Sequence, residues 1–270
     1  MIGRYLYKYV SFDEDMLVLN LISQYSMKFS APSAFNDPFD CNPHYKSSAS
    51  PQSDRPDLFA LINTPHKSPS DRLRARQRAV NRTNIAFDSG AFHEDSMSRI
   101  GIVSLSRTPW HVLMWSHYAN KHTGFVVEFL EPHEFSEGAD GEHSRWLVPF
   151  PVKYVTERPV IKRWSQMSQA DVENVFLAKS TEWVYEQEER VIDYIRGPGI
   201  YSYEPSIIKS VIAGCNISDE HFSALSAAVK EANKNRAVKI ALYRAEIDPK
   251  KYQLNIPRFR RERNPAAALL

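Results

Sequence analysis

The stretch Lys179–Arg190 reads K-S-T-E-W-V-Y-E-Q-E-E-R and runs directly into Val191–Ile195, which reads V-I-D-Y-I. The apolar, β-branched second segment predicts a strand, and the polar segment predicts the turn that leads into it. Side chains alternate between the two faces of a strand, so Glu186, Glu188 and Arg190 are expected on one face. Two carboxylates on one face repel unless a cation or a ligand pairs with them. The segment therefore predicts either a functional site or a solvated edge strand in which Arg190 neutralises the acids.

The composition is that of an ordinary globular protein. The chain has 270 residues, of which 43% are hydrophobic and 24% charged, enough for a domain with a real core. The net charge of +2 indicates no global preference for nucleic acid or an anionic membrane. Cys41 and Cys215 lie far apart and predict neither a disulfide framework nor a metal site. Because no signal peptide and no run of about 18 apolar residues is found, we expect a cytoplasmic protein without membrane contact.

Short strands outnumber long helices in the predicted order of elements. Segments rich in β-branched and aromatic residues predict strands at 5–10, 27–30, 100–105, 124–129, 147–155, 191–195, 206–213 and 238–247. Helical periodicity and capping residues predict helices at about 13–22, 108–119, 168–183 and 219–233. Strands and helices do not alternate regularly. This order predicts an α+β fold with a mixed or antiparallel central sheet flanked by helices.

One region departs from this pattern. Residues 47–70 are rich in Ser and Pro, which predicts a loop or an insertion. A helical pattern with five arginines follows at 71–87, and such a charge run is usually a solvated face. We therefore predict a single domain over residues 1–257, with an insertion and a basic helix at about 47–90. Residues 258–270 form a basic tail that we expect to be mobile.

Two polar features could contribute to a site. The turn sequence N-D-P-F-D contains Asn36, Asp37 and Asp40, whose side chains either bond to nearby backbone N–H groups or face a ligand. Lys8 is the cation of the first strand. It either meets a phosphate or carboxylate or points to water.

A third cluster joins the strand at 100–105 to the helix that follows. Ser104 and Ser106 share one strand face, and Trp115, His117 and Tyr118 lie in the helix. Aromatic side chains beside a histidine can form the floor of a pocket for a flat ring. Aromatic residues at helical spacing more often lie in the core, so both interpretations remain open.

Several of these phrases recur together in one family. They are Y-L-Y-K-Y at the start, F-N-D-P-F-D, S-L-S, M-W-S-H-Y-A-N-K-H-T-G-F and W-V-Y-E-Q-E-E-R. In this order they resemble the bacterial and phage family catalogued as domain of unknown function 2971, from Tyr5 to about Gly214. The family carries no settled activity, so this resemblance predicts a relationship and not a function.

A more distant resemblance suggests chemistry. A basic residue on the first strand, an S-x-S strand and an E-x-E turn before a strand are similar in order to ADP-ribosyltransferases of the Arg–Ser–Glu type. There the basic residue and the serine strand help to hold NAD, and the second Glu stabilises an oxocarbenium-like transition state. The resemblance implies Glu188 as the catalytic carboxylate and Glu186 as the acceptor-side one. Lys8, or Arg4 if the strand register slips, stands where that family has Arg or His.

The same hypothesis assigns roles to the neighbouring side chains. NAD is the expected substrate, and no metal is predicted. Trp115 or Tyr118 would stack on nicotinamide or adenine. Lys179 or Arg190 would hold the pyrophosphate or orient Glu188. Further candidates in the same segment are Trp183 and Tyr185.

Three functions remain open from the sequence. The first transfers ADP-ribose to a protein or nucleic-acid acceptor, or hydrolyses NAD, in a toxin or phage-defence effector that an inhibitory partner could restrain. The second is a nuclease or phosphodiesterase-type hydrolase that uses Lys179 and the acids Asp37, Asp40, Glu186 and Glu188. The third is a non-enzymatic module that binds a nucleotide or a protein on its aromatic side chains. The oligomeric state is left open.

Overall fold

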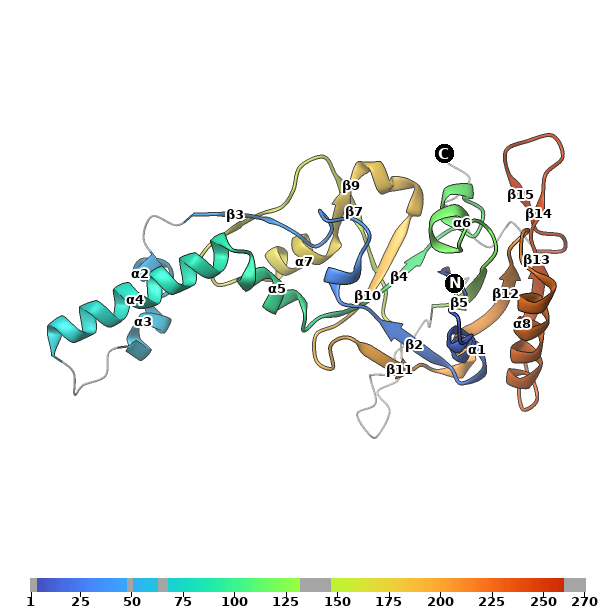
Figure 1. The fold of residues 1–270 in the computed structure, drawn as a ribbon, viewed down its shortest axis with the longest axis horizontal. Coiled ribbons are helices and arrows are strands. Elements are labelled where there is room, and N and C mark those ends of the chain that lie inside the picture. The colour runs from blue at the N-terminus through green and yellow to red at the C-terminus, as the bar shows by residue number, and fades with distance from the viewer. Residues whose placement is uncertain (1–3, 48–50, 63–67, 132–146, 260–270) are drawn as a thin grey trace.

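The centre of the molecule is a seven-stranded sheet with the order β13-β12-β5-β1-β4-β10-β6 (Figure 1). The computed structural model describes residues 4–47, 51–62, 68–131 and 147–259. The sheet strands are β1 (Tyr5–Val10), β4 (Gly101–Ser106), β5 (Phe125–Leu130), β6 (Phe150–Pro151), β10 (Glu188–Asp193), β12 (Ile208–Ala213) and β13 (Ala241–Arg244). Within this sheet β12 and β13 pair in parallel, and the other neighbours pair antiparallel. The predicted α+β fold with a mixed central sheet is confirmed.

Helices cover both faces of the sheet, which explains why its central strands are apolar on both sides. Five of the six residues of β5 are buried, and five of six in β4. On one face α1 (Asn20–Ser23) and α8 (Asp219–Ala232) pack Ile22 and Leu225 against Val127. On the other face α6 (Val112–Tyr118) packs Met114 and Trp115 against Val126.

The sheet divides between β1 and β4. β1 pairs with β5 along its whole length, from Tyr5 to Val10. It pairs with β4 at a single position, Tyr7 opposite Ser106. Ser106 in turn lies opposite Glu188 of β10. The row Tyr7, Ser106 and Glu188 therefore joins the two halves of the sheet. β4 ends at Ser106, and its preceding residues do not pair with β1.

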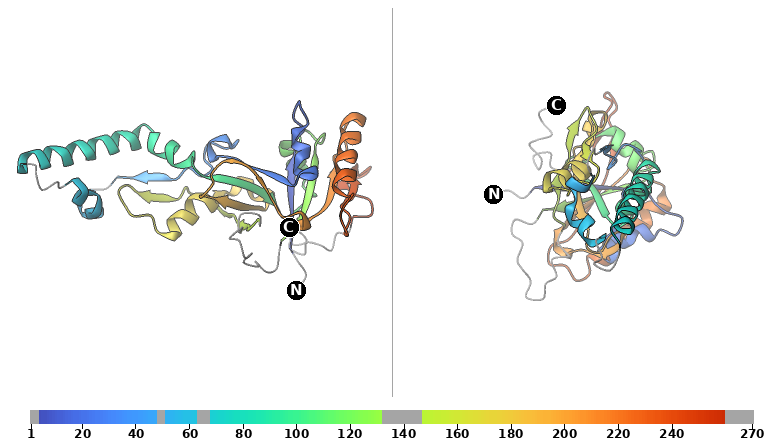
Figure 2. Two further views of the ribbon diagram at one scale, coloured as in Figure 1. Left: turned by 90° about the horizontal axis from the view of Figure 1, so that it is seen from below. Right: turned by 90° about the vertical axis from the view of Figure 1, so that its left-hand side faces the viewer.

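An arm projects from the body on the side of β10 (Figures 1 and 2). It consists of α2 (Pro51–Asp54), α3 (Pro56–Ile62), α4 (Pro69–Asp88) and α5 (Ala91–Met97). A parallel pair, β3 (His44–Lys46) with β8 (Val160–Lys162), lies at its base. Residues 47–70 were predicted to be a loop or an insertion, and the loop alternative is wrong in part because the segment contains α2 and α3. Each of these helices begins at a proline, which is a favoured first residue of a helix.

The remaining elements are short and complete the edges of the body. They are the 3₁₀ helices η1 (Leu17–Leu19), η2 (Pro32–Ala34), η4 (Thr181–Glu186) and η5 (Pro205–Ile207), α7 (Gln169–Leu177), and the paired strands β2 (Ser26–Phe29) with β11 (Gly199–Ser202), β7 (Lys153–Val155) with β9 (Ala178–Ser180), and β14 (Glu246–Ile247) with β15 (Leu254–Asn255).

Several predicted boundaries are wrong. The helix predicted from residue 108 begins at Val112, and the one predicted over 13–22 is η1 followed by α1. The helix capped by Ser168 ends at Leu177, where the chain turns into β9 and then η4. The strands predicted at 147–155 and 238–247 each divide into two short strands that belong to different sheets.

The predicted tail begins inside the core. Phe259 is buried, and its ring lies 5.3 Å from that of Tyr243 and 5.7 Å from that of Trp110. The expectation of a mobile tail is wrong for this residue, and residues 260–270 lie outside the described part. No helix among the described residues is long and apolar enough to cross a membrane.

Candidate functional site

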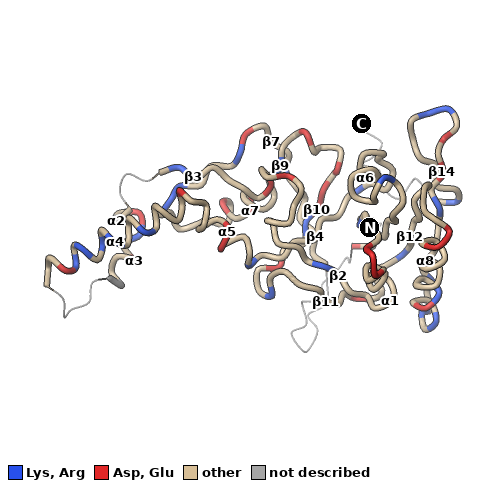
Figure 3. Tube along the Cα trace, viewed as in Figure 1, with Lys and Arg blue, Asp and Glu red and all other residues tan. Residues whose placement is uncertain are grey.

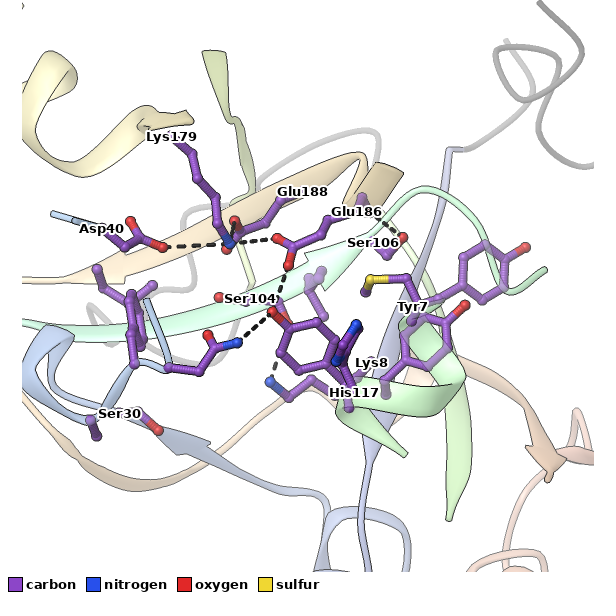
Figure 4. A pocket seen from close by; sticks show the side chains of 18 residues that line it. Tyr7, Lys8, Ser30, Asp40, Ser104, Ser106, His117, Lys179, Glu186 and Glu188 are labelled. Carbon is purple, nitrogen blue, oxygen red and sulfur yellow. Dashed lines mark hydrogen bonds and ion pairs between the residues drawn. The ribbon is translucent and has the colours of Figure 1, made fainter. Parts of the chain in front are cut away.

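A cavity of about 310 Å³ opens beside β1 and β4 (Figure 4). It is lined by β1, β4, the turn after η2, helix α6 and the segment that carries the E-x-E motif. Ten of the sequence-predicted site residues line it: Lys8, Asn36, Asp40, Ser104, Ser106, His117, Tyr118, Lys179, Glu186 and Glu188. Residues that lie up to about 180 positions apart in the sequence therefore meet around one space.

Lys179 is the centre of a buried charge cluster. Its Nζ donates to Glu186 Oε2 at 2.5 Å and to Glu188 Oε2 at 3.0 Å, and lies 3.5 Å from Asp40 Oδ2. All four side chains are buried. Burial lowers the pKa of Lys179, but the three carboxylates outweigh burial and hold that pKa well above its usual value. Lys179 therefore stays charged and pairs with Asp40, Glu186 and Glu188 at the same time.

The turn between the two glutamates places both at the cavity. Gln187 adopts the left-handed conformation with φ of 46° at the end of η4, which non-glycine residues rarely do. Ser106 supports this turn, because its hydroxyl donates to the backbone carbonyl of Glu186 at 2.6 Å. Ser106 is itself 1% exposed, so its hydroxyl positions the E-x-E turn.

Arg190 contacts Glu188 but does not itself line the cavity. Its Nε and Nη2 donate to the two carboxylate oxygens of Glu188 at 2.8 and 3.0 Å, and Nη2 donates to Asp40 Oδ2 at 2.6 Å. Its Nη1 donates to the carbonyl of Phe176 at 2.7 Å. Arg190 is fully buried, so it is placed to orient Glu188 and not to contact a pyrophosphate.

Glu188 is held as an anion. Burial alone would raise its pKa, but the charges of Arg190 and Lys179 outweigh burial and hold the pKa well below its usual range. A hydrogen bond from the side chain of Ser104 acts in the same direction. Glu188 is therefore a fixed negative charge at the cavity wall.

Glu186 has the opposite environment. Burial raises its pKa and the charge of Glu188 adds to this effect, whereas Lys179 and Tyr118 oppose it; the net pKa is raised. Tyr118 Oη donates to Glu186 Oε1 at 2.5 Å and accepts from Asn36 Nδ2 at 3.3 Å. When the pKa values of two carboxylates differ in this way, one can stay an anion while the other accepts a proton. Here Glu188 is the anion and Glu186 is the candidate proton acceptor.

Lys8 is the first-strand cation that reaches the cavity. Its Nζ donates to the backbone carbonyl of Ser104 at 3.1 Å. Burial lowers its pKa to about 8, although the charge of Glu188 opposes this shift. Arg4, the alternative considered from the sequence, instead pairs with Glu131 and Glu189, away from the cavity lining.

Three predicted aromatic residues do not line the cavity. Trp115 is 0% exposed and its indole N–H donates to a backbone carbonyl, so it belongs to the core. Trp183 lies beside the cavity, where its Nε1 donates to Asp37 Oδ2 at 2.7 Å and its ring centre lies 5.2 Å from Lys179 Nζ. Tyr185 packs beside Trp183. Tyr118 and His117 remain as the predicted ring systems at the cavity wall.

Sequence reasoning missed several lining residues, among them Ser30, Phe35 and Met114, and also a supporting residue, Tyr154. The hydroxyl of Tyr154 in β7 accepts the backbone N–H of Glu188 at 2.7 Å. Burial raises the pKa of Tyr154 to about 12, so the phenol stays neutral. Tyr154 lies opposite Lys179 in the parallel pair of β7 with β9. Such a pairing depends on long-range contacts, and no local motif marks it.

The acids named for a hydrolase divide into two groups. Asp40, Glu186 and Glu188 meet at Lys179, whereas Asp37 bonds to Trp183 and to the backbone N–H of Phe39. Across the described ranges, no group of three or more His, Cys, Asp or Glu side chains is arranged to hold a metal ion.

Comparison with known proteins identifies one similarity. A family described as protein of unknown function (DUF2971) matches residues 114–191, which include the α6 aromatics and the E-x-E-x-R segment. No curated protein and no solved structure matches the chain. The resemblance predicted from the sequence is thus confirmed over these residues, and the chain is similar there to a family of unknown function.

Proposed function

We propose that this protein is an NAD-using enzyme of the ADP-ribosyltransferase type. It breaks the bond between nicotinamide and ribose and passes ADP-ribose to an acceptor or to water. The observation that carries the proposal is the meeting of Lys8, Ser104, Glu186 and Glu188 at one cavity. They lie on or next to the adjacent strands β1, β4 and β10, the elements that the distant resemblance names.

Glu188 suits the step in which the glycosidic bond breaks. The electron pair of that bond leaves with nicotinamide, so positive charge develops on the ribose. A fixed anion at the cavity wall stabilises this charge more than it stabilises the uncharged ribose of the ground state. Arg190 holds both carboxylate oxygens, which fixes the direction of the anion before the substrate binds.

Glu186 suits the step in which the acceptor attacks. The acceptor hydroxyl bonds to the ribose carbon and loses a proton. Glu186 has a raised pKa and can take that proton, and Tyr118 holds its Oε1 in place. The same arrangement serves water in hydrolysis.

The volume of the cavity favours one part of the substrate. About 310 Å³ is at the lower end of the range for ligand pockets. We infer that the nicotinamide and its ribose enter, and that the adenosine half lies outside. Lys8 then supplies a positive charge for the phosphate that joins them.

Nicotinamide release from NAD, measured by chromatography, tests the proposal. Glu188→Gln is expected to lower the rate by a factor of about 10² or more, as for loss of one preorganised group at a reacting centre. Glu189→Gln is the matched control. Glu189 is the next residue, is equally buried, and pairs with Arg4 and Arg107 instead of facing the cavity.

Circular dichroism and thermal melting must show that both variants fold. Loss of release in folded Glu188→Gln with activity retained in Glu189→Gln supports the proposal. Equal rates in the wild type and folded Glu188→Gln contradict it, as does the absence of nicotinamide release by the wild type with a cell extract added as a source of acceptor.

A further inference from the structure

The arm carries a row of arginines on an exposed helix face. Helix α4 has five arginines and two aspartates over its 20 residues, and none of its residues is buried (Figure 3). Arg74, Arg78 and Arg82 are exposed and lie at four-residue intervals, so they share one face. With a rise of 1.5 Å per residue, neighbouring positions in the row lie about 6 Å apart.

Both acids of α4 have partners outside this row. At the start of the helix, Asp71 Oδ2 accepts a hydrogen bond from Ser68 Oγ at 2.6 Å. Asp88 pairs with Arg163 of the loop after β8, at 2.7 Å. The arginine row is therefore a local positive surface on a protein whose total charge is close to neutral.

An aromatic cavity of about 360 Å³ lies at one end of the row, with Arg82 in its lining. Tyr45, Phe87, Phe92 and Trp164 contribute rings to its wall. The ring centres of Phe87 and Phe92 lie 4.3 Å apart, and Phe92 is 40% exposed. The other cations of the lining, Arg55 and Lys162, pair with Asp57 and Asp54. Arg82 thus connects the positive row to an exposed aromatic surface.

We propose that this surface binds single-stranded nucleic acid. The row Arg74, Arg78 and Arg82 contacts phosphates of the backbone, and the cavity takes an unstacked base against Phe92. A basic track beside aromatic rings is the general arrangement for single strands, because every base has a face that can stack. A paired base cannot leave its stack to enter the cavity without breaking the pair. An acidic protein would contact the arginines without using the aromatic rings. A base stacks on the rings as well, so the aromatic cavity favours nucleic acid.

The surface is separate from the candidate active site, so this proposal does not depend on the NAD reaction. Fluorescence anisotropy of the full chain with a fluorescein-labelled 20-nucleotide oligo-dT measures it. Three phosphate contacts to a single strand predict a slope of about −2 for log K against log salt concentration. The affinity should then fall about 20-fold between 50 and 200 mM salt.

Variants separate the two parts of the surface. The triple substitution Arg74→Gln, Arg78→Gln and Arg82→Gln should weaken binding at least tenfold at 50 mM salt and at least halve the slope. Phe92→Ala should weaken binding about fivefold without changing the slope. The control Lys250→Gln with Lys251→Gln removes two charges from the hairpin between β14 and β15 and should change neither quantity.

Four results would contradict the proposal. They are an affinity for a 20-base-pair duplex equal to that for oligo-dT, unchanged oligo-dT affinity in the arginine triple variant, unchanged oligo-dT affinity in Phe92→Ala, and complete displacement of oligo-dT by polyglutamate. Polyglutamate competition would indicate an acidic protein partner instead. Glu188→Gln should bind oligo-dT as the wild type does, so failure of the NAD proposal leaves this test intact.

Discussion

Replacement of Arg190 by Met tests the buried charge cluster on which the candidate site depends. Arg190 donates four hydrogen bonds at 2.6–3.0 Å, two to Glu188, one to Asp40 and one to a backbone carbonyl. Met has a similar length but no donor. The substitution leaves two buried carboxylates with Lys179 as their remaining cation.

Removal of one partner from a buried ion pair costs about 3–5 kcal/mol, because the other partner keeps its desolvation cost. For a chain of this size, each kcal/mol lost from the free energy of unfolding lowers the melting temperature by about 3 °C. Arg190→Met should therefore melt about 10 °C below the wild type. Arg190→Lys keeps the charge and loses the two-point contact with Glu188. Its melting temperature should lie between those of the wild type and Arg190→Met.

The loss should also depend on pH. The folded-state pKa of Glu188 lies below its unfolded value, so its contribution to stability is complete above the unfolded pKa and declines as pH falls toward the folded pKa. Arg190→Met removes that contribution. The difference in free energy of unfolding between the wild type and the variant should shrink by about 1 kcal/mol between pH 7 and pH 3.5.

Urea denaturation followed by circular dichroism at the two pH values gives both quantities. Arg107→Met is the control, because Arg107 is partly exposed and its partner Glu189 keeps Arg4. We expect this control to cost about 1 kcal/mol or less. A loss in Arg190→Met no larger than in the control, or one that does not change with pH, would refute the reasoning.

Three further predictions use other contacts of the structure. Tyr118→Phe removes a hydrogen bond that lowers the pKa of Glu186, so the acidic limb of the pH–rate profile for nicotinamide release should move to higher pH; an unchanged limb contradicts this role. NAD affinity measured by calorimetry should fall as pH rises from 7 to 9, because the pKa of Lys8 is about 8, and Lys8→Met should remove this dependence. Phe259→Ala should lower the free energy of unfolding by about 3–5 kcal/mol in urea titrations, whereas a loss under 1 kcal/mol would place the ring outside the core.

The central strands were predictable because their sequences are apolar on both faces. β1 has the predicted bounds Tyr5–Val10, and β4 and β5 each lie within one residue of the prediction. The helix starts were less predictable. Thr108 does accept the backbone N–H of Trp110, as a helix cap would, but α6 begins only at Val112. A local capping pattern does not decide whether the chain continues into a helix.

The candidate site was predictable in its residue types and not in its geometry. Strand alternation places Glu188 and Arg190 on one face, and the structure pairs them. The position of Lys179 among three carboxylates depends on β9, which forms by pairing with β7 where the sequence predicted more helix. Trp115 lies in the core and Tyr118 lines the cavity, although they lie only three positions apart on α6. Helical periodicity alone therefore did not distinguish their positions.

The contact of Arg190 with Asp40 spans 150 positions of the chain. Closing a loop of this length costs entropy before any contact inside it contributes, so such links tend to form late in folding. During synthesis, the charge cluster cannot assemble until Arg190 has left the ribosome. A partly made or locally unfolded chain therefore exposes unpaired acids and no complete cavity. The proposed activity therefore requires these long-range contacts to form, and it should end when they open.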